Sequence, residues 1–368
     1  MRNFLKSWKN AGGCTVVVSD DNGSRFAIAR PATAGKPKVV SYGEEHVGGE
    51  AKSLAAALKG FRLRGTSNGA TLLGAGEYQF LVVDAPDVPE AELKSAMKWR
   101  LKDIVGFPVE EAVFDLLAIP GPDGAAFRTR SMFAVVSRSE TLKRRVAKFD
   151  EARFPLSVID VPETAQRNIA ALYEEEGRGI VWLYFDESGG LMTISFNGEL
   201  YHARRLRRSS ENVLSRNVVP DRRGSGTRAE PIEISSANEN VLDRNVVPDR
   251  RRSGIRDGPI EIASTGVADG DGESPEEIFN RLLLEVQRTL DNFERQFSFI
   301  PLTKIMVGPE PEDTGLAAFL RQNLSVPVEE VALENVLDFP AGAVPGKRDQ
   351  WRFFHLFGCA LRNAAATP

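Results

Sequence analysis

The stretch from Thr15 to Ala29 reads TVVVSDDNGSRFAIA: a β-branched run, two acidic residues, a glycine turn and a second alternating run. The same order of features returns between Ile180 and Ala203, which opens with IVWLYFDESGGLMTISF. Each stretch predicts a β-hairpin, because β-branched and aromatic residues flank a turn in which glycine readily takes a positive φ. Two halves of one chain that open on the same hairpin indicate a duplicated α/β lobe with a cleft between the copies.

Length and composition limit the class of protein. A chain of 368 residues with 42% hydrophobic and 27% charged residues is typical of a globular protein with two or three domains. The net charge of −4 provides no global field that would recruit nucleic acid or a membrane. The two cysteines, Cys14 and Cys359, lie at opposite ends of the chain and favour a reducing compartment without a disulfide.

No targeting or membrane-spanning segment is expected. The apolar run after the basic amino terminus, Thr15 to Val18, is shorter than the roughly 7–15 residues of a signal-peptide core. No run approaches the roughly 20 apolar residues of a transmembrane helix. We therefore expect a cytoplasmic protein.

The first half of the chain alternates predicted strands and helices and ends at the polar stretch 174–179. The continuous apolar run 79–83 predicts a buried strand. Ser137, with Glu140 three positions later, predicts a capping box that opens a helix. The strands are expected at 38–42, 79–83, 114–119, 132–136 and 156–160, and the helices at 51–58, 93–104, 142–149 and 164–173.

A tandem repeat interrupts the second half. Glu211–Leu214 recurs as Glu239–Leu242, and Asn217–Arg223 recurs as Asn245–Arg251, 28 residues later in both cases. Two copies are too few for a solenoid, and the composition, rich in arginine, glycine and proline, favours a flexible insertion. Such a segment is either a solvated, duplicated loop or a basic arm for an acidic partner or a membrane surface.

Regular structure is expected again from residue 274. Ser274, Pro275 and Glu277 predict a helix start with a capping box. The helix that follows carries an apolar stripe over 278–297. The remaining elements are expected at 304–308 and 328–333 as strands, and at 315–323 and 351–363 as helices.

Common catalytic motifs are absent from the sequence. Gly74-Ala75-Gly76 lacks the third glycine of a dinucleotide fingerprint and leads into a strand rather than a helix. There is no P-loop and no serine in a nucleophile elbow. The three histidines lack the spacing of a metal site, so we expect structural roles for His46, His202 and His355.

Phosphoryl transfer in the cleft between the lobes is the remaining catalytic hypothesis. It needs carboxylates that hold Mg²⁺ and glycine turns whose backbone N–H groups approach phosphate. An acid before a glycine turn is also what an ordinary tight hairpin uses. The candidate carboxylates are Asp20, Asp21, Asp186 and Glu187, and the candidate glycines are Gly23, Gly189 and Gly190.

A family resemblance becomes specific at Asp87 to Pro120, which reads DVPEAELKSAMKWRLKDIVGFPVEEAVFDLLAIP. This segment resembles the inserted subdomain of the PilM-type, actin-like components of type IV pilus machines. Gly74 to Pro86, GAGEYQFLVVDAP, is similar to the MshI branch of that family, the mannose-sensitive haemagglutinin (MSHA) pilus biogenesis proteins. Shorter matches to family motifs are Asp160–Glu163, Asn197–Leu200 and Gly358–Arg362.

The resemblance implies an α/β protein with the actin-like ATPase fold, in which two RNase H-like lobes face each other and an α+β subdomain is inserted in the first lobe. The first lobe is expected at 1–176, with the inserted subdomain at about 87–160. The second lobe is expected at 177–368, with the tandem-repeat insertion at about 209–272.

The hairpins depart from the family's ATP-binding pattern. ATP-binding members carry Asp-Ile-Gly at both hairpins, where this chain has Ser19-Asp20-Asp21 and Asp186-Glu187-Ser188. A family glycine pair is replaced by Gly308-Pro309-Glu310, in which proline removes a donor and glutamate repels phosphate. We therefore expect no cofactor and no metal, with weak or absent binding of ATP and Mg²⁺. The vestigial nucleotide-binding residues are then Asp20, Gly23, Asp186, Gly189, Gly190 and Gly308.

The resemblance implies a non-enzymatic cytoplasmic scaffold for an MSHA-like type IV pilus and its motor complex. It would dock the cytoplasmic tail of an inner-membrane PilN-like partner in a groove between the first lobe and the inserted subdomain. Trp99 and Phe107 are the partner-binding candidates. The apolar stripe of the same helix is typical of a face that packs on the hydrophobic core: Leu93, Met97, Leu101 and Ile104. The alternatives are an active actin-like ATPase or sugar kinase, and a type II secretion L-type protein, which requires a transmembrane helix near the carboxyl terminus.

Overall fold

The computed structural model describes residues 13–20, 23–30, 32, 35–46, 54–61, 63, 68–121, 131–206 and 274–362. The insertion expected at about 209–272 lies outside the described residues. Within the described ranges, no helix is both long enough and apolar enough to cross a membrane.

Two five-stranded sheets have the same strand order and pairing, which confirms the duplicated lobe. In each sheet three antiparallel strands, joined by hairpins, continue into two parallel strands. The first sheet has the order β3-β2-β1-β4-β8, made of β1 (Cys14–Asp20), β2 (Gly23–Arg30), β3 (Lys38–His46), β4 (Gly69–Leu72) and β8 (Leu156–Asp160). The second has the order β11-β10-β9-β12-β13, made of β9 (Gly179–Asp186), β10 (Gly189–Phe196), β11 (Glu199–Leu206), β12 (Leu302–Val307) and β13 (Val328–Glu330).

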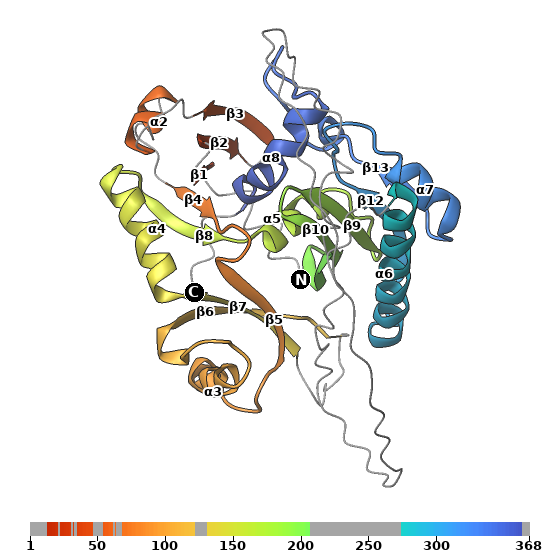
Figure 1. Cartoon of the computed structure of the whole chain (residues 1–368), viewed down its shortest axis with the longest axis horizontal. Coiled ribbons are helices and arrows are strands. Elements are labelled where there is room, and N and C mark those ends of the chain that lie inside the picture. The colour runs from red at the N-terminus through yellow and green to blue at the C-terminus, as the bar shows by residue number, and fades with distance from the viewer. Residues whose placement is uncertain are drawn as a thin grey trace, which may run out of the picture. The chain divides into compact units, whose positions relative to one another are not determined.

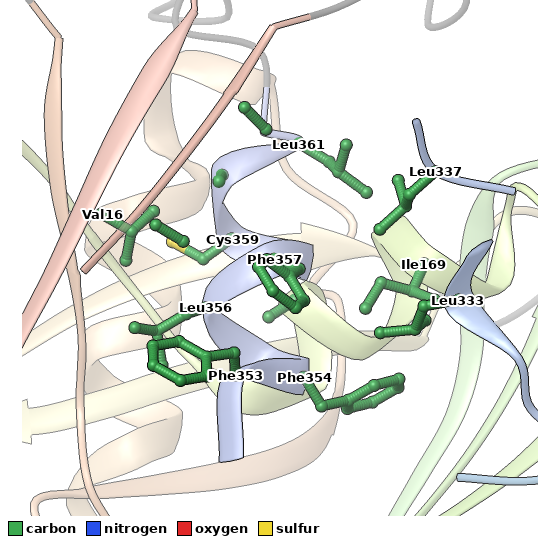
Figure 2. Close-up of a cluster of buried hydrophobic side chains, with 14 of the residues drawn as sticks. Val16, Ile169, Leu333, Leu337, Phe353, Phe354, Leu356, Phe357, Cys359 and Leu361 are labelled. Atoms are coloured by element: carbon green, nitrogen blue, oxygen red, sulfur yellow. The ribbon is translucent and has the colours of Figure 1, made fainter. Parts of the chain in front are cut away.

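Two helices, α5 (Pro162–Ala170) and α8 (Lys347–Ala360), form the core that the two sheets share. One buried cluster contains Val16 of the first sheet, Trp182 of the second, Ile169 of α5 and Phe357 of α8. Figure 2 shows the side chains of α8 directed to both sides of the helix, toward Val16 on one side and toward Ile169 and Leu333 on the other. The central helices therefore join the two lobes through apolar packing.

The outer face of each sheet carries its own helices (Figure 1). On the first sheet, α2 (Leu54–Gly60) and α4 (Ser139–Glu151) pack around Val17 and Phe149. On the second sheet, α6 (Pro275–Gln296) and α7 (Leu316–Asn323) pack around Val181 and Val286. Two short 3₁₀ helices, η1 (Val109–Glu111) and η2 (Leu333–Asn335), complete the described elements.

The inserted subdomain is a three-stranded antiparallel sheet covered on one face by α3 (Glu90–Lys102). Its strands have the order β5-β7-β6 and are β5 (Tyr78–Asp84), β7 (Ser131–Arg138) and β6 (Ala112–Ala118). The strand predicted over 79–83 is confirmed as β5, but its predicted burial is wrong, because β5 is an edge strand of this sheet and Val82 is 59% exposed. The sheet also shifts the bounds expected for this subdomain, about 87–160, since it includes β5 whereas β8 belongs to the first large sheet.

The two capping predictions have opposite outcomes. At α6 the Ser274 hydroxyl accepts a hydrogen bond from the Glu277 backbone, and the Glu277 carboxylate accepts from the Ser274 backbone, so this capping box is confirmed. At α4 the prediction is wrong: Arg138 is the N-cap residue and makes no side-chain cap. The Ser137 hydroxyl instead donates to the Glu77 carbonyl at 2.7 Å, because Ser137 is the last residue but one of β7 and faces β5.

Candidate functional site

The first hairpin, β1–β2, places an acid and a glycine opposite each other at the cleft. Asp20 pairs with Gly23, whose φ of 148° is in the range that favours glycine. The Asp20 carboxylate accepts a hydrogen bond from the Arg25 guanidinium at 3.2 Å. The Ser24 hydroxyl donates to that of Ser19 at 3.0 Å, closing the strands behind the turn.

The second hairpin, β9–β10, repeats this arrangement. Asp186 pairs with Gly189, whose φ is 129°. The Asp186 carboxylate accepts a hydrogen bond from the Ser188 backbone N–H at 2.8 Å, so this acid stabilises the turn that it precedes. A Cβ on the next residue, Gly190, would lie 2.6 Å from the Phe185 ring, which means that packing requires glycine there.

The segment that follows β12, from Gly308 onward, is hydrogen-bonded to β9 and to its own next turn. The Gly308 N–H donates to the Leu183 carbonyl at 2.6 Å, and a Cβ on Gly308 would lie 2.7 Å from the Tyr184 ring. The Glu310 carboxylate accepts from the Thr314 hydroxyl at 2.8 Å, and burial raises the pKa of Glu310. The Gly308 N–H and the Glu310 carboxylate are therefore hydrogen-bonded within the protein.

A cavity of about 690 Å³ opens between the hairpins and extends along α4. Of the six predicted nucleotide-binding residues, Asp20, Gly23 and Asp186 line this cavity, whereas Gly189, Gly190 and Gly308 do not. The lining contains six acidic and six basic residues, so its formal charge is balanced. These charged residues are Asp20, Glu44, Glu45, Glu77, Asp186, Glu187, Arg25, Arg144, Arg145, Lys148, Arg205 and Arg352.

Both hairpins are bonded to the second turn of α8. The Trp351 indole N–H donates to the Phe185 carbonyl at 2.7 Å, and the Tyr184 hydroxyl donates to the Trp351 carbonyl at 2.7 Å. On the other side, Arg25 donates to the Arg352 carbonyl at 3.3 Å. Residues next to the turns of the two hairpins are thus bonded to the same turn of α8.

A buried acid lies where the inserted subdomain meets both lobes. Glu163, at the start of α5, is only 1% exposed. One carboxylate oxygen accepts from the Tyr78 hydroxyl of β5 at 2.6 Å, and the other accepts from Arg205 of β11 at 3.1 Å. Arg205 also donates to the Tyr78 hydroxyl at 2.6 Å, which closes a triad of three side chains. Sequence reasoning missed this triad, because its members come from three elements far apart in the chain.

The two histidines whose side chains the structure describes, His202 and His355, are packed against other parts of the protein. His355 lines the cavity, but it is buried against Tyr184, and burial lowers its pKa to about 4. Burial also lowers the pKa of His202 on β11 to about 4. Both imidazoles are therefore uncharged at neutral pH. Across the described ranges, no group of three or more His, Cys, Asp or Glu residues could hold a metal ion; the side chain of His46 lies outside the described residues.

The two partner-binding candidates lie on the inserted subdomain and outside the cavity lining. Trp99 on α3 is 73% exposed, and the Lys102 ammonium lies 5.8 Å from the centre of its ring. Phe107 is half-buried against the core of the subdomain, with the Arg138 guanidinium 4.1 Å from the centre of its ring. In the predicted stripe, Met97 and Leu101 are buried and Leu93 packs against them, whereas Ile104 is 50% exposed.

Two sheets of equal strand order around two central helices, with paired hairpins at a common cavity, define the actin-like ATPase fold. No known family description and no curated protein matches the sequence. Among solved structures, a chain of the PilM–PilN type IV pilus biogenesis complex superposes with a TM-score of 0.62 over 97% of this chain and all of that one, at 15% identity. This protein is therefore PilM-like in fold.

More distant structures resemble the chain less. A Bacteroides thetaiotaomicron protein with an actin-like ATPase fold gives a TM-score of 0.40 at 9% identity, covering 95% of this chain and 98% of that one. The cytoplasmic domain of EpsL, an inner-membrane component of the type II secretion system of Vibrio cholerae, gives 0.36 at 14% identity, covering 53% and 71%. Neither adds to the fold assignment.

Proposed function

We propose that this protein is a cytoplasmic scaffold of a type IV pilus machine, of the MSHA type, which docks the cytoplasmic tail of a PilN-like inner-membrane protein. The observation that carries the proposal is the superposition over the whole chain on a protein from the PilM–PilN complex. Through that partner the scaffold would lie at the inner membrane, next to the pilus motor.

The inserted subdomain is the preferred docking module. Four of the seven large hydrophobic side chains exposed among the described residues belong to it, although it is much smaller than either lobe: Val82, Trp99, Ile104 and Val113. Exposed apolar groups concentrated on one module are typical of an interaction surface. Trp99, with its large ring in solvent, is the best single anchor, because tryptophan is enriched among the residues that dominate binding energy.

A pull-down with the cytoplasmic tail of the membrane partner tests the docking role. Trp99→Ala should weaken capture by about tenfold or more, as expected for truncation of an aromatic anchor. Leu284→Ala is the matched control, because Leu284 is 51% exposed but lies on α6, outside the inserted subdomain. Equal capture by Trp99→Ala and the parent chain would reject Trp99 as the anchor, and no capture by the parent would reject the docking role.

We further propose that the cleft is a degenerate nucleotide site and that the protein is not an enzyme. Glu163, the buried acid beside the cavity, has both oxygens engaged by Tyr78 and Arg205, so it does not offer a free carboxylate to a water molecule. The glycines at 190 and 308 are required by packing. Both observations indicate that these cleft residues stabilise the fold, and both support the absence of catalysis that we propose.

An active ATPase or sugar kinase on the same fold remains the rival, favoured by the position of Asp20 and Asp186 on the cavity wall. Calorimetric titration with Mg²⁺ and ATP separates the two. The scaffold proposal expects no saturable binding tighter than about 1 mM. Micromolar, Mg²⁺-dependent binding that is lost in Asp186→Asn would establish the rival.

A further inference from the structure

We propose that the face of α4 that lines the cavity binds an acidic segment of a partner protein. This inference rests on the proposed scaffold function, because it states the charge of a docked partner. The surface concerned is a row of four side chains, which we call the α4 row: Thr141, Arg144, Arg145 and Lys148.

The α4 row lies on one side of its helix. Its members are spaced by three, one and three residues, and side chains three, four and seven residues apart share a helix face. With a rise of about 1.5 Å per residue, the row extends for roughly 10 Å along the cavity wall. All four residues line the cavity of about 690 Å³, which is within the size range of ligand clefts, roughly 300–1,000 Å³.

Two cations of the row have no partner among the residues that the structure describes. The Arg145 guanidinium is half-buried and paired with Glu77, which holds it in place. Arg144 and Lys148 are exposed and make neither an ion pair nor a side-chain hydrogen bond with any described residue. Like charges one helical turn apart repel each other, so an anion placed between them relieves that repulsion.

The surroundings favour carboxylates over a polyphosphate. Five acidic residues of the hairpin side also line the cavity, and they repel the concentrated charge of a triphosphate more strongly than single, separated carboxylates: Asp20, Glu44, Glu45, Asp186 and Glu187. Phosphate sites depend on free backbone N–H groups, but the Gly74 N–H, two residues after the end of β4, already donates to the Glu77 carboxylate at 2.6 Å. A peptide with one or two separated carboxylates meets the row without concentrating charge near the hairpins.

Selection of random linear peptides displayed on phage, against the purified full chain, tests the proposal without assuming a partner. We expect the selected peptides to be enriched in Asp and Glu. The affinity of the strongest peptide should fall roughly 3- to 30-fold in the double variant Arg144→Ala/Lys148→Ala, as expected for two exposed charge contacts, and it should weaken with added salt. Lys143→Ala is the matched control, because Lys143 is exposed on α4 but does not line the cavity, and it should change affinity less than about twofold.

Several results would overturn the proposal. These are failure to select any peptide, selection without acidic enrichment, or equal weakening by Lys143→Ala and the double variant. Displacement of the peptide by millimolar inorganic phosphate would assign the row to phosphate-bearing ligands instead. The proposed scaffold function is tested separately. If the parent chain binds acidic peptides but does not capture the PilN-like tail, the acidic-peptide site stands and only the assignment of a PilN-like partner is rejected. An unchanged melting temperature in the double variant shows that the fold is intact.

Discussion

The crossing of the two central helices gives the most direct test of the fold, through Gly358→Ala. Gly358 lies on α8 where it meets α5, and a Cβ built there would lie 2.1 Å from the carbonyl oxygen of Ala165 and 2.7 Å from its carbonyl carbon. Both contacts are with backbone, which cannot rotate away as a side chain can. The Asn168 amide also donates to the Gly358 carbonyl at 2.9 Å, so displacement of α8 would strain a buried hydrogen bond.

The magnitude follows from opposing effects. Overpacking costs about 1–3 kcal/mol, and disturbing a buried hydrogen bond costs about 1–3 kcal/mol more. Replacing glycine by alanine inside a helix gains about 1 kcal/mol. The net expectation is a loss of about 1–5 kcal/mol in the free energy of unfolding, or a fall in melting temperature of roughly 2–20 °C.

Thermal unfolding followed by tryptophan fluorescence and circular dichroism measures this change. Gly106→Ala is the control, because a Cβ on Gly106 meets nothing within 4 Å, and its effect should remain within about 0.5 kcal/mol. Ala165→Gly should not rescue Gly358→Ala, since the clash is with the backbone of Ala165. If Gly358→Ala melts at or above the temperature of the parent chain, helix propensity outweighs the contact, and the close crossing of α5 and α8 is refuted.

Three further predictions concern other parts of the structure. Glu163→Gln should destabilise the protein by about 1–3 kcal/mol in urea titration, because it weakens the acceptor for Arg205 and Tyr78; an unchanged midpoint would show that the triad contributes nothing. Because burial lowers the pKa of His202 to about 4, below its value near 6.5 in the unfolded chain, the unfolded state binds more protons between these values and stability falls as pH falls. His202→Gln should therefore lose less melting temperature than the parent between pH 7 and pH 5, and an equal loss would contradict the assignment. Ser274→Ala should cost about 1 kcal/mol through the lost capping box and speed hydrogen exchange in the first turn of α6, whereas unchanged exchange there would argue against the cap.

Local sequence signals predicted the elements whose stability is local. The hairpins at β1–β2 and β9–β10 formed where alternating runs flank a glycine turn. The start of α6 at Ser274 followed from a cap that involves only the next few residues. Residues Val286, Leu290 and Phe293 are buried as the stripe predicted. In each case the partners lie within a turn or a hairpin of one another.

The features that the sequence did not predict depend on pairing between strands that are far apart in the chain. The apolar run of β5 has the composition of a central strand, but its only strand partner among the described elements is β7, about fifty residues later in the chain. Ser137 satisfies a local capping pattern, yet β7 extends through it and directs its hydroxyl to Glu77. Binding roles for Trp99 and Phe107 stay predictions, although the exposure of Trp99 agrees with its position off the helix stripe.

The cleft and the inserted subdomain are connected through the Glu163 triad. Tyr78 belongs to the subdomain, Glu163 to a central helix and Arg205 to the second lobe, and their mutual hydrogen bonds hold all three parts in one arrangement. Trp351 of α8 also donates to Phe185 of β9, and Arg25 of β2 donates to the Arg352 carbonyl, so α8 is hydrogen-bonded to one strand of each hairpin. A scaffold that presents an exposed subdomain to a membrane partner gains from the same bonds, because a fixed docking surface loses less conformational entropy on binding.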